Sequence, residues 1–319
     1  MAEVVFVHGI GPLEEPAGEL HTAWVAALAG SLRNAEETEA ADALEGGRIS
    51  TAMAYYRDLF RPYTPRDEWD QPLPEAMTDT ARRVGQDFIE NIEAHASRPE
   101  DREEAARELT PFREDLGPEQ GVFEVFRVMV GSLGRCGPVA RSVFGALKAT
   151  IVTNLAQVAA YLDDERIRER AQEALLAEIG PETRAVYAHS LGTVVAYEAL
   201  HRLREPLPLL VTFGSPLGLR TIVRERLRPQ PPHVPGMLQR WVNVADRDDY
   251  IVASLDLRKV VTDDSPKVLG ETLMVRNRGL DAHPAVKYLG HKRTARPLAE
   301  ALRPCPDRAR GGRPRGAAE

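Results

Sequence analysis

Cysteines and long apolar runs are both scarce in this chain. Only two of its 319 residues are cysteines, Cys136 and Cys305, which are too few and too far apart for a disulfide framework or a zinc site. No stretch approaches the roughly 18–20 uncharged apolar residues of a spanning helix. At the N-terminus, Glu3 precedes a short apolar run and no basic region is present, unlike the pattern of a signal peptide. We therefore expect a cytoplasmic protein with no transmembrane segment.

An excess of positive charge is also lacking. The 41 Lys and Arg residues are outnumbered by 48 Asp and Glu residues, which gives a net charge of −7. Nucleic-acid binding needs clustered Lys and Arg, so we expect no nucleic-acid partner. Aromatic residues are sparse at 6%, but 43% of the residues are hydrophobic, which is enough for a full core. The sequence does not indicate an oligomeric state.

Strand and helix patterns alternate at both ends of the chain. Helical spacing of apolar residues predicts helices over 20–32, 163–179 and 191–204. Short β-branched runs bounded by turn residues predict strands over 4–7, 49–56, 184–189, 207–213, 238–244 and 271–276. Such alternation indicates βαβ units. We therefore expect an α/β fold with about six mostly parallel strands and helices on both faces of the sheet.

A long segment interrupts this alternation. Residues 61–180 begin with a charged, proline-rich stretch and continue into apolar residues that predict two helices, 121–133 and 139–162. The last residues, 303–319, are rich in Pro, Arg and Gly, and we expect them to be a disordered tail.

The sequence A-H-S-L-G at 188–192 lies between a predicted strand and a predicted helix. This is the context of a nucleophile elbow, a sharp turn that exposes the hydroxyl of its serine, here Ser190. The residues two positions before and after that serine must be small so that the strand and helix can pass closely. Ala188 and Gly192 meet this requirement. The less favoured interpretation is that Ser190 only caps a helix.

A glycine-rich turn follows the first predicted strand. Acyl transfer places negative charge on a carbonyl oxygen, which two fixed backbone N–H groups can stabilise. The N–H of Leu191 would supply one of them, and the turn at His8, Gly9 and Ile10 the other. A dinucleotide-binding motif is excluded because Glu14 stands where its third glycine would be. An ordinary turn between a strand and a helix is the alternative.

Three motifs together resemble the lipase and esterase branch of the α/β-hydrolases. They are V-H-G-I-G at 7–11, A-H-S-L-G at 188–192 and T-F-G-S-P-L-G at 212–218. The resemblance covers roughly residues 3–60 and 180–295 and not the segment between them. It implies that the N–H groups of Ile10 and Leu191 form the oxyanion hole. With the right-handed crossover rule, it also implies the strand order 2-1-3-4-5-6.

The resemblance also suggests the other catalytic residues, since the triad of this fold runs serine, acid, histidine along the chain. By alignment with related lipases, Asp249 is the acid, and Asp246 is its main rival. His283 is the expected base, because an H-x-x-x-x-Y-L stretch is familiar at this point of the fold, and His291 is the second choice. We expect His189, next to the nucleophile, to point the wrong way for catalysis, into the surroundings of the sheet.

The interrupting segment has a role in this fold as well. Residues 1–302 would form a single domain, with a core of 1–60 and 181–302 and a helical cap, 61–180, over the nucleophile. Packing within the cap is the favoured role of its apolar helices, and lining an acyl pocket is the second. Docking onto a membrane surface is weakly supported, because the basic residues show no one-sided polar face. These residues are Arg127, Arg135, Arg141 and Lys148.

The activity implied by the resemblance is that of a serine hydrolase which cleaves a carboxylic ester. The substrate would be a small-molecule or lipid-like acyl compound, and no metal or cofactor is required. The residues do not separate this activity from that of a thioesterase, peptidase or acyltransferase. A hydrolase-fold binding module without turnover is a further alternative.

Overall fold

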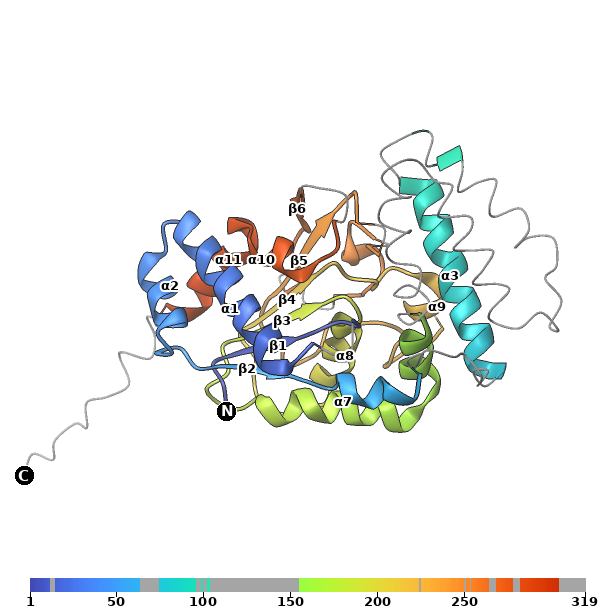
Figure 1. Cartoon of the computed structure of the whole chain (residues 1–319), viewed down its shortest axis with the longest axis horizontal. Coiled ribbons are helices and arrows are strands. Elements are labelled where there is room, and N and C mark those ends of the chain that lie inside the picture. Colours follow the sequence, from blue (N-terminus) through green and yellow to red (C-terminus); the bar gives the residue numbers. More distant parts are fainter. Residues whose placement is uncertain are drawn as a thin grey trace, which may run out of the picture.

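A six-stranded parallel sheet forms the centre of the structure, and helices lie on both of its faces (Figure 1). The computed structural model describes residues 1–11, 15–63, 75–95, 99, 102–103, 155–223, 225–249, 251–252, 254–263, 268–277 and 282–303. The predicted α/β class and the parallel sheet are confirmed.

The strands follow the order β2-β1-β3-β4-β5-β6 across the sheet, in agreement with the predicted order. Because β1 and β3 are neighbours, the turns that follow them lie side by side at the carboxyl edge. The strands span Val4–Val7 (β1), Thr51–Ala54 (β2), Ala185–His189 (β3), Leu209–Phe213 (β4), Trp241–Asp246 (β5) and Leu273–Val275 (β6).

Several strands are shorter than the apolar runs that predicted them. Leu207 and Leu238, the expected first residues of two strands, pair only in an isolated bridge outside the sheet's named strands. Tyr55 and Tyr56 follow β2 and contact the ring of His8 instead of extending the strand. Apolar residues near a strand end can thus be buried without joining the ladder, and periodicity does not separate the two cases.

Alternate residues of the strands β1 to β5 enter two separate hydrophobic cores. In β1, Val5 and Val7 face one core, whereas Val4 and Phe6 face the other. Burial on both faces explains why the strands read as continuous apolar runs.

The two cores are closed by different helices. The face bearing Phe6 is covered by α1 (Ala17–Asn34), α2 (Thr38–Glu45), α10 (Ala285–Leu289) and α11 (Lys292–Leu302). The other face is covered by α7 (Glu165–Glu178), α8 (Leu191–Leu200) and a helical stretch at 155–163. Short 3₁₀ helices occur at Arg57–Tyr63 and Leu257–Lys259.

Helix α8 ends at Leu200, four residues before the predicted end at 204. The next turn is tightened by i→i−3 hydrogen bonds from the N–H groups of Arg202 and Leu203. Pro206 then favours an extended chain.

The segment expected to form a cap divides into parts with different positions. Helix α7 falls within 61–180 but packs on the sheet beside α8. Helix α3 (Glu75–His95) instead packs against α9 (Arg220–Val223), which follows β4, and its Asn91 donates to the carbonyl of Val252 in the loop after β5 (Figure 1). The predicted helix 121–133, most of 139–162 and the tail from 304 onward lie outside the described residues.

A buried ionic cluster ties α7 to the helix that follows Ser190. The Glu198 carboxylate of α8 accepts hydrogen bonds from Tyr161 Oη at 2.6 Å, Gln172 Nε2 at 3.0 Å and the Arg228 N–H at 3.0 Å. Arg168 Nε lies 3.2 Å from the same carboxylate. A buried charge is tolerated when it is paired and hydrogen-bonded. The cluster therefore fixes α8 against its neighbours.

Among the helices that the structure describes, none combines the length and the low polarity that crossing a lipid bilayer would require.

Candidate active site

Ser190 joins β3 to α8 in a backbone conformation that residues other than glycine rarely adopt. Its φ is 53° and its ψ is −130°, and strain of this kind is concentrated at functional positions. Two glycines lie so close to this turn that neither has room for a side chain. A Cβ on Gly192 would lie 2.5 Å from the carbonyl oxygen of His8, and a Cβ on Gly9 would lie 2.6 Å from the Cβ of Ser190.

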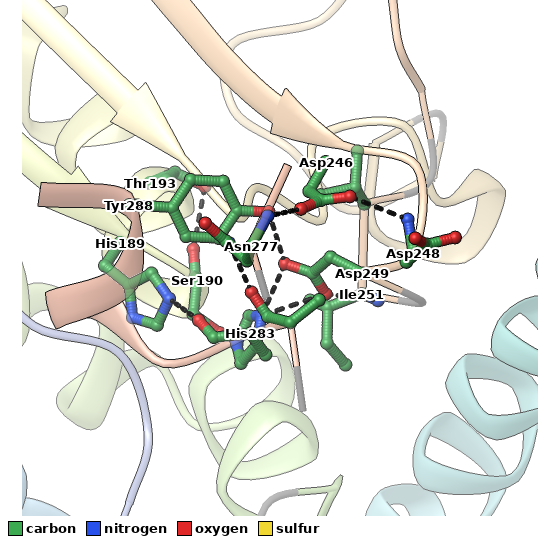
Figure 2. Close-up of polar contacts among 12 residues, drawn as sticks. His189, Ser190, Thr193, Asp246, Asp248, Asp249, Ile251, Asn277, His283 and Tyr288 are labelled. Atoms are coloured by element: carbon green, nitrogen blue, oxygen red, sulfur yellow. Dashed lines mark hydrogen bonds and ion pairs between the residues drawn. The ribbon is translucent and has the colours of Figure 1, made fainter. Parts of the chain in front are cut away.

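A chain of hydrogen bonds runs from Ser190 through His283 to Asp249 (Figure 2). Ser190 Oγ lies 3.0 Å from His283 Nε2, and His283 Nδ1 lies 2.9 Å and 3.0 Å from the two carboxylate oxygens of Asp249. An ionised carboxylate can only accept, so Nδ1 carries the proton and Nε2 can accept from the serine hydroxyl.

The three residues come from loops at one edge of the sheet. Ser190 follows β3, Asp249 follows β5, and His283 lies between β6 and α10. In open parallel sheets, ligands bind outside the carboxyl ends of the strands. The His283 side chain is 27% exposed, whereas that of Asp249 is fully buried. The imidazole is therefore the accessible end of the pair.

Comparisons of the chain with protein-family models, with curated proteins and with solved structures find no match. The roles of these residues are therefore inferred from their own contacts.

The Asp249 carboxylate is held in its charged form. Burial alone would raise the pKa of this carboxyl. The charge of His283 and hydrogen bonds from His283, Tyr288 and the Ile251 N–H outweigh burial and leave the pKa below its ordinary value. Asp249 can therefore stabilise a protonated imidazole.

The side chains of the alternative acid, Asp246, and of the alternative base, His291, both contact Asn277. Asp246 accepts hydrogen bonds from the N–H groups of Asp248, at 2.9 Å, and Asn277. His291 Nε2 lies 2.9 Å from Asn277 Oδ1. The Asn277 amide also donates to the carbonyl of Ala282, next to His283. Asp246 and His291 thus support the loop that carries His283, through an asparagine that no sequence pattern singled out.

The turn after β1 lies directly against Ser190. Gly9 contacts the serine, and Ile10 follows it. Leu191 is the first residue of α8, and the first N–H groups of a helix have no partner within it. Tyr56 fixes His8 at the start of this turn by two hydrogen bonds. Its hydroxyl donates to the His8 carbonyl, and its N–H donates to His8 Nε2 at 3.2 Å.

The His8 ring is neutral. Burial lowers its pKa to about 3. Its Nε2 accepts from the Tyr56 N–H, so its Nδ1 carries the proton and donates to the Gly9 carbonyl. His8 therefore orders the turn without adding a charge beside it.

His189 contacts the backbone of His283. Its Nε2 lies 2.8 Å from the carbonyl oxygen of His283, and the two imidazole rings are 4.6 Å apart (Figure 2). A carbonyl only accepts, so Nε2 must carry the proton. Gly214, at a φ of +56°, leaves room for this contact, since a Cβ there would lie 3.1 Å from His189 Nε2. The His189 ring packs against Trp24 and Phe213 in the surroundings of the sheet, as expected, but alternation along β3 does not reveal a partner 94 residues away.

The buried histidines predict a loss of stability in mild acid. Burial lowers the pKa of His8 and of His189 to about 3, from 6.5. Below 6.5 the unfolded chain binds protons that the folded chain does not, so the free energy of unfolding falls as pH falls. Each histidine contributes up to ~1.4 kcal/mol per pH unit. Urea unfolding between about pH 7 and about pH 5 measures this slope.

His8→Gln provides the matched variant for this measurement, because glutamine does not titrate. Its slope should be shallower than that of the parent protein, whatever its stability at neutral pH. Equal slopes in the two proteins would contradict the neutral state assigned to His8.

Within the described part of the chain, no group of three or more His, Cys, Asp or Glu side chains is arranged to hold a metal ion.

Proposed function

We propose that this protein is a serine hydrolase with an α/β-hydrolase fold, and that it cleaves carboxylic esters through an acyl-enzyme on Ser190. The observation that carries the proposal is the continuous chain of hydrogen bonds from Ser190 Oγ to His283 and Asp249. A serine hydroxyl is a weak nucleophile unless a base accepts its proton, and this geometry supplies that base.

In the first half of the reaction, Ser190 Oγ attacks the substrate carbonyl carbon while its proton passes to His283 Nε2. Asp249 keeps the Nδ1 proton in place and stabilises the imidazolium that forms. The imidazolium then protonates the leaving alcohol, and the acyl group stays on Ser190 as an ester.

The negative charge of the tetrahedral intermediate needs donors fixed in advance. We assign this task to the N–H groups of Ile10 and Leu191, because Gly9 packs against Ser190 and Leu191 begins α8. In the second half of the reaction, His283 takes a proton from water, the hydroxide attacks the acyl-enzyme, and the imidazolium returns the proton to Ser190 Oγ.

The alternative activities differ from ester hydrolysis in the leaving group or in the acyl acceptor. A thioester, an amide or an acyl acceptor other than water would use the same steps. A panel of one acyl group presented as an ester, a thioester and an amide separates these activities.

Labelling with a fluorophosphonate probe tests the proposed function. The probe should form a covalent adduct on Ser190 that mass spectrometry of the peptides locates, because only an activated serine reacts readily with it. Heat-unfolded protein is the control and should not be labelled. Failure of the folded protein to be labelled would contradict the proposal and favour a binding module without turnover.

A further inference from the structure

Tyr288 is the one tyrosine among the described residues whose hydroxyl reaches the proposed acid. It lies in α10, five residues after His283, and its side chain is fully buried. Its Oη lies 2.7 Å from Asp249 Oδ2, the same oxygen that lies 2.9 Å from His283 Nδ1 (Figure 2). A single carboxylate oxygen is thus shared between the phenol and the imidazole.

We propose that Tyr288 is a positioning residue which sets how strongly Asp249 attracts the proton of His283. This inference rests on the proposed function. Through this shared oxygen, Tyr288 would tune the base without touching the substrate.

The direction of the effect follows from the hydrogen bond. Burial and the adjacent Asp249 carboxylate both raise the pKa of Tyr288, so its hydroxyl stays protonated and acts as a donor. A donor that binds a carboxylate draws charge from it and makes it a weaker acceptor for other protons. Tyr288 therefore lowers the proton affinity of His283, which keeps more of the imidazole neutral and able to act as a base.

Other charged or titratable groups face the same site from neighbouring elements. His189 of β3 contacts the His283 ring and is neutral because burial lowers its pKa to about 3. Asp246 of β5 also acts on Tyr288, and His291, before α11, interacts with Asp246. None of these groups is linked to an Asp249 oxygen by a hydrogen bond in the described part of the chain. Tyr288 has that direct link.

Packing is the competing explanation, since the Tyr288 ring also contacts Phe213 and His189. Tyr288→Phe keeps the ring and removes only the hydroxyl. Tyr187→Phe is the matched control, because Tyr187 is equally buried and its hydroxyl donates to the Thr294 carbonyl at 2.9 Å. Each variant loses one buried hydrogen bond, but only one of them loses a bond to the acid.

The test is an NMR titration of the His283 ring, assigned by comparison with His283→Asn. In Tyr288→Phe the midpoint of the His283 titration should move to higher pH by on the order of 0.5–1 unit, a roughly three- to tenfold change in proton affinity. In Tyr187→Phe the midpoint should not move. The acid limb of the fluorophosphonate labelling rate should shift in parallel.

Site-specific replacement of Tyr288 by 3-fluorotyrosine provides a second measurement that changes the packing very little. The fluorinated phenol is a stronger donor, so the His283 midpoint should move to lower pH. Midpoints unchanged in both variants, or moved equally by Tyr187→Phe, would overturn the role of Tyr288. Absence of labelling at Ser190 in the parent protein would instead overturn the proposed function, whatever the titration shows.

Discussion

Replacing Ser190 by alanine is expected to lower ester hydrolysis by about 10⁴- to 10⁶-fold, which is the largest effect that any single substitution should have on this protein. Without the hydroxyl, no acyl-enzyme forms, and the residual rate comes only from substrate binding and the oxyanion donors. The measurement is the steady-state hydrolysis of a short p-nitrophenyl ester by purified protein, with circular dichroism to verify folding.

Ser215→Ala is the control for this experiment. Ser215 also follows a strand, but its hydroxyl is 2.8 Å from Thr193 Oγ1, whereas that of Ser190 lies 3.0 Å from His283 Nε2. Its loss should change turnover by less than about tenfold, the scale of one neutral hydrogen bond. Undiminished turnover in folded Ser190→Ala, or equal losses in both variants, would refute the assignment of the nucleophile.

Replacing Asp249 by asparagine should reduce turnover by about 10⁴-fold, although the side chain keeps its shape. Asp249 Oδ1 accepts from the Ile251 N–H at 3.0 Å and lies 3.0 Å from His283 Nδ1, whereas Oδ2 lies 2.9 Å from His283 Nδ1 and accepts from the Tyr288 hydroxyl. The asparagine oxygen will take the Oδ1 place, because a backbone N–H must be satisfied there. The amide NH₂ then points at His283 Nδ1 and forces the imidazole proton onto Nε2, where it blocks acceptance from Ser190.

The double variant Ser190→Ala/Asp249→Asn should be no less active than Ser190→Ala alone, because the two residues act as one unit. Asp246→Asn is the matched control. Its carboxylate binds two backbone N–H groups and not His283, so the turnover of folded protein should fall by less than about tenfold. A larger loss in Asp246→Asn than in Asp249→Asn would identify Asp246 as the acid.

The α/β class and the parallel sheet could be predicted because they depend on local patterns, whereas the strand order was implied by the resemblance together with the right-handed crossover rule. The apolar run at β1 and the turn at 188–192 are visible in short windows of sequence. Strand limits were predicted less well. The spacing of apolar residues indicates which residues are buried and not which residues pair in the sheet. Leu207 and Leu238 are buried without joining a strand.

Within the site, the sequence favoured Ser190, Asp249 and His283, and the structure brings their side chains into hydrogen-bond contact. Their catalytic roles stay predictions. Sequence reasoning assigned no role to the residues that support them, among which are Tyr56, His189, Asn277 and Tyr288, although Tyr288 is the tyrosine of the H-x-x-x-x-Y-L stretch. Each of these is an ordinary core or turn residue by composition, and its partner lies elsewhere in the chain.

By itself, the sequence determined where the chain turns sharply and which residue types stand at those turns, because glycine spacing and strand periodicity are local properties. Only the tertiary structure decided which carboxylate meets His283 and which tyrosine shares it. Asp246 and Asp249 are three residues apart in one acidic turn, and both are buried. The packing of α10 and the loop after β6 determines which of them faces the imidazole, and that choice depends on contacts between residues 34 and 39 positions apart.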